Sequence, residues 1–236
     1  MTTGTKPHAA ANNLQKKLLA LFGGLVLVVA GGAVVLATQA EEQRSSPVAV
    51  FLGDSYTQGF GAVPLDRRWS SLVAHDADWT EVNQGQGGTG FVTTADENTC
   101  GQAHCPTYVD RVPDVIAAAP DIVLISGGQN DRMVLATDPD RVHAAVDTTY
   151  DGIRQGLPDA RIIAVGPSTA EPATPQLEEL DSWVQAAAAR VDADYVSLLD
   201  PLVIKQSMVG PDGVHVTDHG YRAIADRVLT VALTDD

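Results

Sequence analysis

Aromatic residues are scarce in this chain, at 5% of 236 residues, although hydrophobic residues as a whole reach 44%. A sizeable core is therefore available, but Val, Leu, Ile and Ala have to build it. About 190 residues follow an apolar N-terminal stretch, and this length suits one globular domain rather than two.

Positive charge is also in short supply. The chain has 15 Lys and Arg against 30 Asp and Glu, and three of the basic residues (Lys6, Lys16 and Lys17) precede the first acid, Glu41. From Glu41 onward, 12 basic and 30 acidic residues give a formal charge of −18. Such a surface is soluble and repels phosphate backbones, so we expect no nucleic-acid partner.

Only two cysteines occur, Cys100 and Cys105, in the segment CGQAHC. A framework of several disulfides is thereby excluded, but two thiols so close together can form one small disulfide, which fits an oxidising compartment. A zinc site that includes His104 is an alternative, although the sequence offers no evident fourth ligand at metal spacing. Two free buried thiols are the remaining alternative.

No charged residue lies between Leu18 and Ala40. About 20 apolar residues are enough to cross the ~30 Å hydrocarbon core of a bilayer, and the two lysines before the run predict a cytoplasmic N-terminus. A cleaved signal peptide ending at Ala40 is the alternative. Either way the domain lies outside the cytoplasm, as a single-pass membrane protein or a secreted one. The expected parts are a tail (1–17), an anchor or signal (18–38), a linker (39–47) and a domain (48–236).

Short β-rich apolar runs alternate with helical patterns in the rest of the chain. This alternation predicts βαβ units and an α/β fold, a three-layer α/β/α sandwich around a parallel sheet. The expected strands are 48–52, 80–83, 121–126, 161–165 and 195–199. The expected helices are 68–75, 107–118, 138–156, 175–191 and 217–233.

Polar residues follow these strands directly, at the sheet edge where ligands bind in such folds. Ser55 comes straight after the first strand, where it is either a nucleophile or an N-capping serine. Asn130 follows the third strand and can offer its amide to an oxyanion, or form a turn. The glycine-rich segment 83–90 after the second strand allows close backbone approach, but its order is not that of a dinucleotide-binding loop.

An acid and a histidine stand together near the C-terminus. Asp212 lies three residues before His215, close enough in a tight loop to accept a hydrogen bond from the imidazole Nδ1. That arrangement fixes the tautomer and leaves Nε2 free as a base. An exposed loop histidine with a capping acid is the alternative, and His219 is expected on the helix surface.

Together these motifs resemble the SGNH hydrolase family, the GDSL-like lipases and esterases. The resemblance runs from about 48 to 233: Ser55 in G-D-S, Gly88 in N-Q-G-Q-G-G (with Gly87 or Gly85 as alternatives), Asn130 in G-Q-N-D, and His215 in D-G-V-H. The G-x-S-x-G elbow of the α/β-hydrolases is absent, and the CGQAHC loop lies outside the family pattern.

The resemblance implies the flavodoxin-like fold of that family and a serine esterase that needs no metal or organic cofactor. Ser55 would attack an acyl carbonyl, with His215 as base and Asp212 as its orienting partner. The Ser55 and Gly88 N–H groups and the Asn130 side chain would hold the oxyanion. We expect short acyl esters as substrates, with O-acetyl groups on envelope glycans as one candidate and a lipid as another. The alternatives are an acyltransferase acting on such a polysaccharide and a non-catalytic glycan-binding module.

Overall fold

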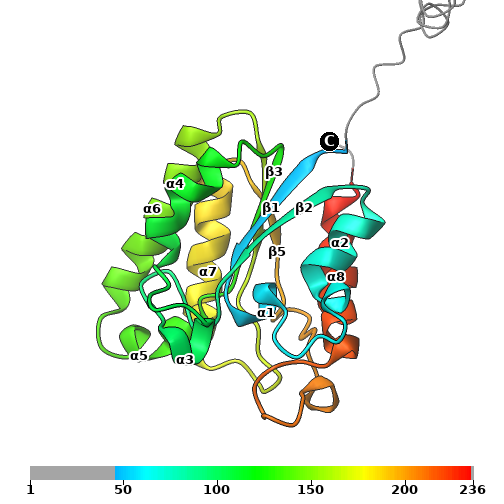
Figure 1. Cartoon of the computed structure of the whole chain (residues 1–236). Coiled ribbons are helices and arrows are strands. Elements are labelled where there is room, and N and C mark those ends of the chain that lie inside the picture. Colours follow the sequence, from blue (N-terminus) through cyan, green and yellow to red (C-terminus); the bar gives the residue numbers. More distant parts are fainter. Residues whose placement is uncertain (1–45, 235–236) are drawn as a thin grey trace, which may run out of the picture. The chain divides into compact units, whose positions relative to one another are not determined.

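The computed structural model describes residues 46–234, which form a single parallel β-sheet flanked by helices (Figure 1). The strand order is β2-β1-β3-β4-β5, and every neighbouring pair is parallel. The strands are β1 (Val48–Gly53), β2 (Thr80–Gly85), β3 (Ile122–Ser126), β4 (Arg161–Val165) and β5 (Asp194–Val196).

Five longer helices supply the outer layers. They are α2 (Trp69–Asp76), α4 (Tyr108–Ala117), α6 (Pro139–Gly156), α7 (Pro175–Arg190) and α8 (Asp218–Ala232). Three single-turn helices lie in the connections: α1 (Ser55–Gln58), α3 (Glu97–Cys100) and α5 (Arg132–Leu135). Short 3-10 turns occupy Leu65–Arg67, Gln129–Asp131 and Gln206–Met208.

Alternation along the buried strands divides the core into two clusters, one on each face of the sheet. Val50 and Leu52 of β1 belong to the cluster that contains residues of α4, α6 and α7. Ala49 and Phe51 belong to the cluster that contains residues of α2 and α8. Because successive side chains of a strand point to opposite faces, a strand buried on both sides has to be apolar throughout. The helices therefore cover both faces of the sheet (Figure 1).

The α/β class and the parallel central sheet predicted from the sequence are confirmed. The weak second strand continues two residues further than expected, to Gly85. The fifth strand ends at Val196 rather than Leu199, because Ser197 Oγ accepts hydrogen bonds from the Leu199 and Asp200 N–H groups and turns the chain. The exposed position of His219 on α8 is as expected.

The expected membrane anchor or signal (18–38) lies outside the described residues. None of the helices between residues 46 and 234 combines the length and apolar character needed to span a bilayer.

Candidate active site

Ser55 lies just beyond the end of β1, at the carboxyl-terminal edge of the sheet. β1 ends at Gly53, and Ser55 is the first residue of α1. Between them Asp54 caps the helix, accepting a hydrogen bond from the Tyr56 N–H (2.9 Å). A Cβ atom at Gly53 would lie 2.1 Å from Thr57 Oγ1, so only glycine fits where the strand meets the helix. The turn thus explains the glycine and the aspartate that precede Ser55.

The glycine-rich segment 86–90, here called the glycine loop, lies directly against α1. A Cβ atom on Gly85, the last residue of β2, would lie 2.1 Å from the Gln58 backbone nitrogen. Beyond it, the Gly87 N–H donates to Gln58 Oε1 (2.9 Å). Gly88 has a φ of +74°, a conformation that favours glycine. The backbone N–H groups of this loop are therefore fixed relative to the start of α1.

Asn130 reaches the same edge from β3. Two glycines with positive φ, Gly127 and Gly128, turn the chain after the end of the strand. The Asn130 Nδ2 donates to the Thr89 carbonyl in the glycine loop (2.9 Å). Because an amide nitrogen carries two protons, the second N–H can serve a substrate oxygen.

Asp131, the next residue, fastens the two loops together. This buried carboxylate accepts hydrogen bonds from the Phe91 N–H (2.7 Å), the Val92 N–H (3.2 Å) and the Thr93 hydroxyl (2.6 Å). Burial raises the pKa of Asp131, and these hydrogen bonds act in the opposite direction. Asp131 thus holds the segment after the glycine loop against the turn that carries Asn130.

His215 and Asp212 pair as the sequence predicted. His215 Nδ1 lies 2.6 Å from Asp212 Oδ2, while Asp212 Oδ1 accepts from the N–H groups of Val214 (3.0 Å) and His215 (2.9 Å). The His215 side chain, followed by these backbone donors, lowers the pKa of Asp212 to about 2. With its Nδ1 proton held by a carboxylate, the imidazole presents Nε2 as a base.

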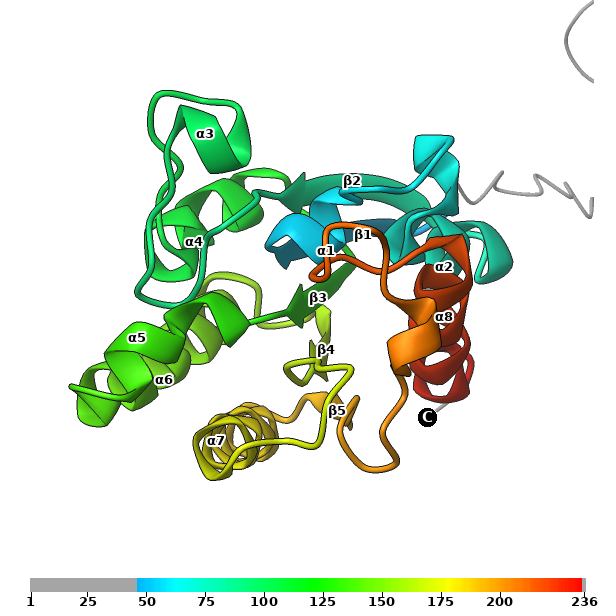
Figure 2. The same ribbon diagram turned by 90° about the horizontal axis from the view of Figure 1, so that it is seen from below.

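The segment 209–217, here called the histidine loop, is in direct contact with α1. The Tyr56 hydroxyl, one residue after Ser55, donates to the Val214 carbonyl, one residue before His215 (2.7 Å). The ring centroids of Phe60 and His215 are 4.3 Å apart. Seen from below the strand ends, the loop before α8 passes beside α1 (Figure 2). The chain thereby brings the serine and histidine segments together from positions 160 residues apart.

Besides Asp131, two buried ionisable side chains of this region were not expected from the sequence, and the first is Asp54. It is 1% exposed, and Gln129 Nε2 donates to its Oδ2 (2.6 Å). Burial raises the pKa of Asp54 to about 7, against the Tyr56 hydrogen bond and the charge of Arg111. Its place in the G-D-S motif was visible in the sequence, but its burial was not.

The second is Arg111, on α4, which is also 1% exposed. Its guanidinium donates to the carbonyls of Gly53 (3.1 Å) and Gln84 (2.6 Å) and to the Thr89 hydroxyl (2.9 Å). It therefore joins the ends of β1 and β2 to the glycine loop. No sequence signal marks it, because an arginine in an amphipathic helix ordinarily faces water.

A mostly apolar pocket of about 280 Å³ adjoins His215. Its lining comes from the segment after α1 and from the histidine loop, and includes Phe60, Pro211, Asp212, His215 and Val216. Phe60 is 53% exposed at this pocket. The pocket offers a place for the apolar part of a small ligand next to the imidazole.

A larger hollow of about 660 Å³ lies at the opposite edge of the sheet, where β4 and β5 begin. Its arginines are Arg154, Arg161 and Arg190. They donate to backbone carbonyls or to Asp147, Asp151 and Asp194. Because these arginines are already paired, we interpret the hollow as structural. It lies at the end of the domain opposite the strand ends that carry the candidate site.

Cys100 and Cys105 form a disulfide, the first of the three alternatives for this pair. Within residues 46–234, no group of three His, Cys, Asp or Glu side chains is placed to hold a metal ion.

All five candidate residues, Ser55, Gly88, Asn130, Asp212 and His215, therefore lie in segments at the carboxyl-terminal edge of the sheet. Hydrogen bonds connect these segments, from α1 to the glycine loop, from the glycine loop to the Asn130 turn, and from α1 to the histidine loop. A hydroxyl, an imidazole–carboxylate pair and several N–H donors thus belong to segments at one edge of the sheet. These are the groups that acyl transfer requires.

Comparison with known proteins finds similarity to one enzyme family. Residues 51–223 match the model of the GDSL-like lipase/acylhydrolase family. The GDSL lipase Rv0518 of Mycobacterium tuberculosis is 28% identical over 223 residues, which are 89% of this chain and 91% of that protein.

Solved structures share the fold. The esterase EstA from Pseudoalteromonas superposes with a TM-score of 0.60 at 14% identity, over 78% of this chain and 96% of its own. A family two carbohydrate esterase from Clostridium thermocellum, in complex with cellohexaose, gives a TM-score of 0.59 at 18% identity, over 78% of this chain and 62% of its own.

Proposed function

Since this chain belongs to the GDSL-like lipase/acylhydrolase family, we propose that it is a serine esterase with Ser55 as nucleophile and His215 and Asp212 as the base and its orienting partner. Membership makes it a carboxylic ester hydrolase. The observation that carries the assignment of residues is the hydrogen bond from the Tyr56 hydroxyl to the Val214 carbonyl (2.7 Å), which joins the serine segment to the histidine loop.

In the proposed reaction, His215 Nε2 takes the proton of Ser55 Oγ while that oxygen attacks the acyl carbonyl. Asp212, held by two backbone N–H groups, keeps the proton on Nδ1 and stabilises the imidazolium. The N–H groups of Ser55 and Gly88 and the second amide proton of Asn130 hold the oxyanion. His215 then protonates the leaving alcohol, and water, deprotonated by His215, releases the acid from Ser55.

The proposed substrates are short-chain acyl esters, with O-acetyl groups of envelope glycans as one class. Two observations support this choice. The pocket beside His215 is small, at about 280 Å³, and a carbohydrate esterase shares the fold. The uncharged run from Leu18 to Ala40 supports a location outside the cytoplasm, either anchored in the cell membrane or secreted.

A series of chromogenic esters from acetyl to long acyl tests this proposal on the full-length chain. We expect turnover of the short esters and a loss of about 10³-fold or more in Ser55→Ala. A fluorophosphonate should label the parent at Ser55. The matched control is Ser182→Ala, at an exposed position of α7, which should keep full activity.

Four outcomes would contradict parts of the scheme. Equal turnover by Ser55→Ala and the parent, or labelling at another serine, would refute the nucleophile. Turnover that rises steadily with acyl length would refute the short-chain preference. Transfer of the acyl group to an added acceptor glycan, with no free acid formed, would make the enzyme an acyltransferase.

A further inference from the structure

The glycine loop has a second neighbour besides α1, and this is the one-turn helix α3. A Cβ atom at Gly87 would lie 2.4 Å from the Thr99 carbonyl oxygen, and one at Gly88 would lie 3.0 Å from Thr99 Cβ. No side chain of the loop separates the two backbones. On its other side Gly87 touches Gln58, whose Oε1 accepts its N–H (2.9 Å). The proposed oxyanion donor Gly88 is thus placed by a loop pressed between α1 and α3.

The helix α3 has little apolar burial to hold it in place. Its first three residues, Glu97, Asn98 and Thr99, are exposed, and Cys100 is the one residue of the turn that is buried (6% exposed). A single helical turn is not stable on its own. A capping box between Asp96 and Thr99 fixes its shape but does not attach it to the rest of the domain.

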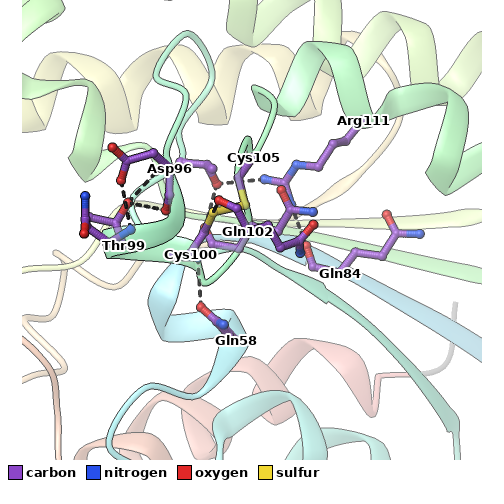
Figure 3. Close-up of a disulfide and its surroundings, with 12 residues drawn as sticks. Gln58, Gln84, Asp96, Thr99, Cys100, Gln102, Cys105 and Arg111 are labelled. Atoms are coloured by element: carbon purple, nitrogen blue, oxygen red, sulfur yellow. Dashed lines mark hydrogen bonds between the residues drawn. A yellow bond between two sulfur atoms is a disulfide. The ribbon is translucent and has the colours of Figure 1, made fainter.

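The attachment comes through Cys105. This residue is 0% exposed, exchanges two backbone hydrogen bonds with Ala95 (2.9 and 3.0 Å), and stands just before α4. The disulfide from Cys105 to Cys100 therefore links α3 to the beginning of a long helix. Figure 3 shows this bond with Thr99 on one side, Gln58 below and Arg111 of α4 on the other side.

We propose that the Cys100–Cys105 disulfide positions the oxyanion hole: it holds α3 as the outer wall that keeps Gly87 and Gly88 against α1. Neither cysteine touches the reacting atoms, so both are positioning residues. This inference rests on the proposed function, in which the Gly88 N–H stabilises the transition state. The oxyanion exists only in the transition state and the intermediate. A displaced donor should therefore lower kcat much more than it weakens binding of the ground-state ester.

The test compares the full-length parent with the double variant Cys100→Ala/Cys105→Ala in short-chain ester hydrolysis. We expect kcat to fall about 10- to 50-fold with KM changed less than twofold, which is less than the ~10²–10³-fold loss from deleting an oxyanion donor. The pH profile should keep its shape, because Asp212 and His215 are untouched. Titration with a fluorophosphonate should still reach one label per chain, but more slowly.

The matched control is Asn98→Ala, on the exposed side of the same helical turn, which should leave kcat unchanged. Where the double variant does not fold, the parent treated with a dithiol reductant replaces it. The reductant is oxidised to its cyclic disulfide while both cysteines become thiols, which are counted. The reduced parent should show the same fall in kcat, and reoxidation should restore it.

Two results would overturn the proposal. One is a kcat within twofold of the parent once the disulfide is absent. The other is a loss of activity matched by an equal loss in the labelling end point, which would mean that the bond only keeps the domain folded. Failure of the proposed function is distinguishable, because the parent itself would then hydrolyse no ester or carry the label elsewhere.

Discussion

Asp212 uses its two carboxylate oxygens for different tasks. Oδ1 accepts from the N–H groups of Val214 and His215, so the carboxylate is fixed within its own loop. Oδ2 remains for Nδ1 of His215, at 2.6 Å. The same contacts hold the pKa of Asp212 at about 2, so the group stays ionised through the neutral range. The loop therefore fixes the orientation and the tautomer of the imidazole at once.

The change Asp212→Asn should separate these two tasks. The amide oxygen can still accept from the two backbone N–H groups, so the loop should keep its shape. The amide nitrogen would then face Nδ1 of His215, leaving the proton on Nε2, where it blocks the base. By analogy with serine proteases, we expect kcat to fall by about 10³–10⁴-fold.

Steady-state kinetics and thermal unfolding measured side by side test this expectation. The unfolding temperature should change little, and Asp140→Asn, at an exposed position of α6, should match the parent in both. An Asp212→Asn enzyme within tenfold of parental kcat would rule out Asp212 as the orienting partner.

The candidate residues could be read from the sequence because each stands at a position with a local signal. Ser55 and Asn130 come directly after strongly apolar strands, and Asp212 lies within one loop of His215. Arg111 gave no such signal, since its burial depends on where the ends of β1 and β2 lie in space. The partner of Asp54, Gln129, was hidden for the same reason: their contact joins residues 75 apart in sequence.

Among the elements, strands and long helices were predictable and single turns were not. A buried strand is apolar throughout and a long helix repeats its apolar face, so both leave a pattern. The helices α3 and α5 have four residues each, too few to show a period. The packing of α3 on the glycine loop depends on a close contact between two backbones, which no side-chain pattern records.

Arg111 joins three elements at one point, and its removal should disturb all three. In Arg111→Met, the carbonyls of Gly53 and Gln84 and the Thr89 hydroxyl lose their shared donor inside the protein. The Gly53 carbonyl keeps the Gln86 N–H as a second donor (3.0 Å). A hydrogen bond from a charged donor is worth about 1.5–3 kcal/mol, and such remaining contacts offset part of the loss, so we expect the free energy of unfolding to fall by about 3–5 kcal/mol. Arg111→Lys can restore one of these contacts and should lose less stability but still lower kcat about tenfold.

Urea unfolding and ester kinetics measure the two effects. The control is Arg132→Met, an exposed arginine at the start of α5, which should change neither quantity by more than about 0.5 kcal/mol or twofold. If Arg111→Lys were folded and as active as the parent, the shared donor would have no part in positioning the glycine loop.

At the scale of the whole molecule, the two edges of the sheet differ in character. Loops rich in glycine gather at the carboxyl ends of the strands, whereas the arginines at the opposite edge are engaged with carbonyls and carboxylates. The first edge also carries buried ionisable groups, namely Asp54, Asp131 and Arg111. The stability of the domain should therefore depend on the protonation of this edge.

Asp54 determines whether the stability of the domain rises or falls with pH. Burial, opposed by the Tyr56 hydrogen bond and the charge of Arg111, raises its pKa to about 7, whereas an unfolded chain ionises Asp near 3.9. Between about pH 4 and pH 7 the folded state thus binds more protons than the unfolded state, so the free energy of unfolding falls as the pH rises.

Asp54→Asn replaces the titrating carboxyl group with an amide of the same size, which does not titrate. Urea unfolding at pH 4 to 8 should show the parent losing roughly 2–4 kcal/mol relative to Asp54→Asn across this range, because each pKa unit corresponds to about 1.36 kcal/mol. Taking the difference between the two proteins cancels the titration of the exposed carboxylates. Parallel stability curves would mean that Asp54 is ionised in the folded domain, its charge balanced by Arg111 and the Gln129 amide.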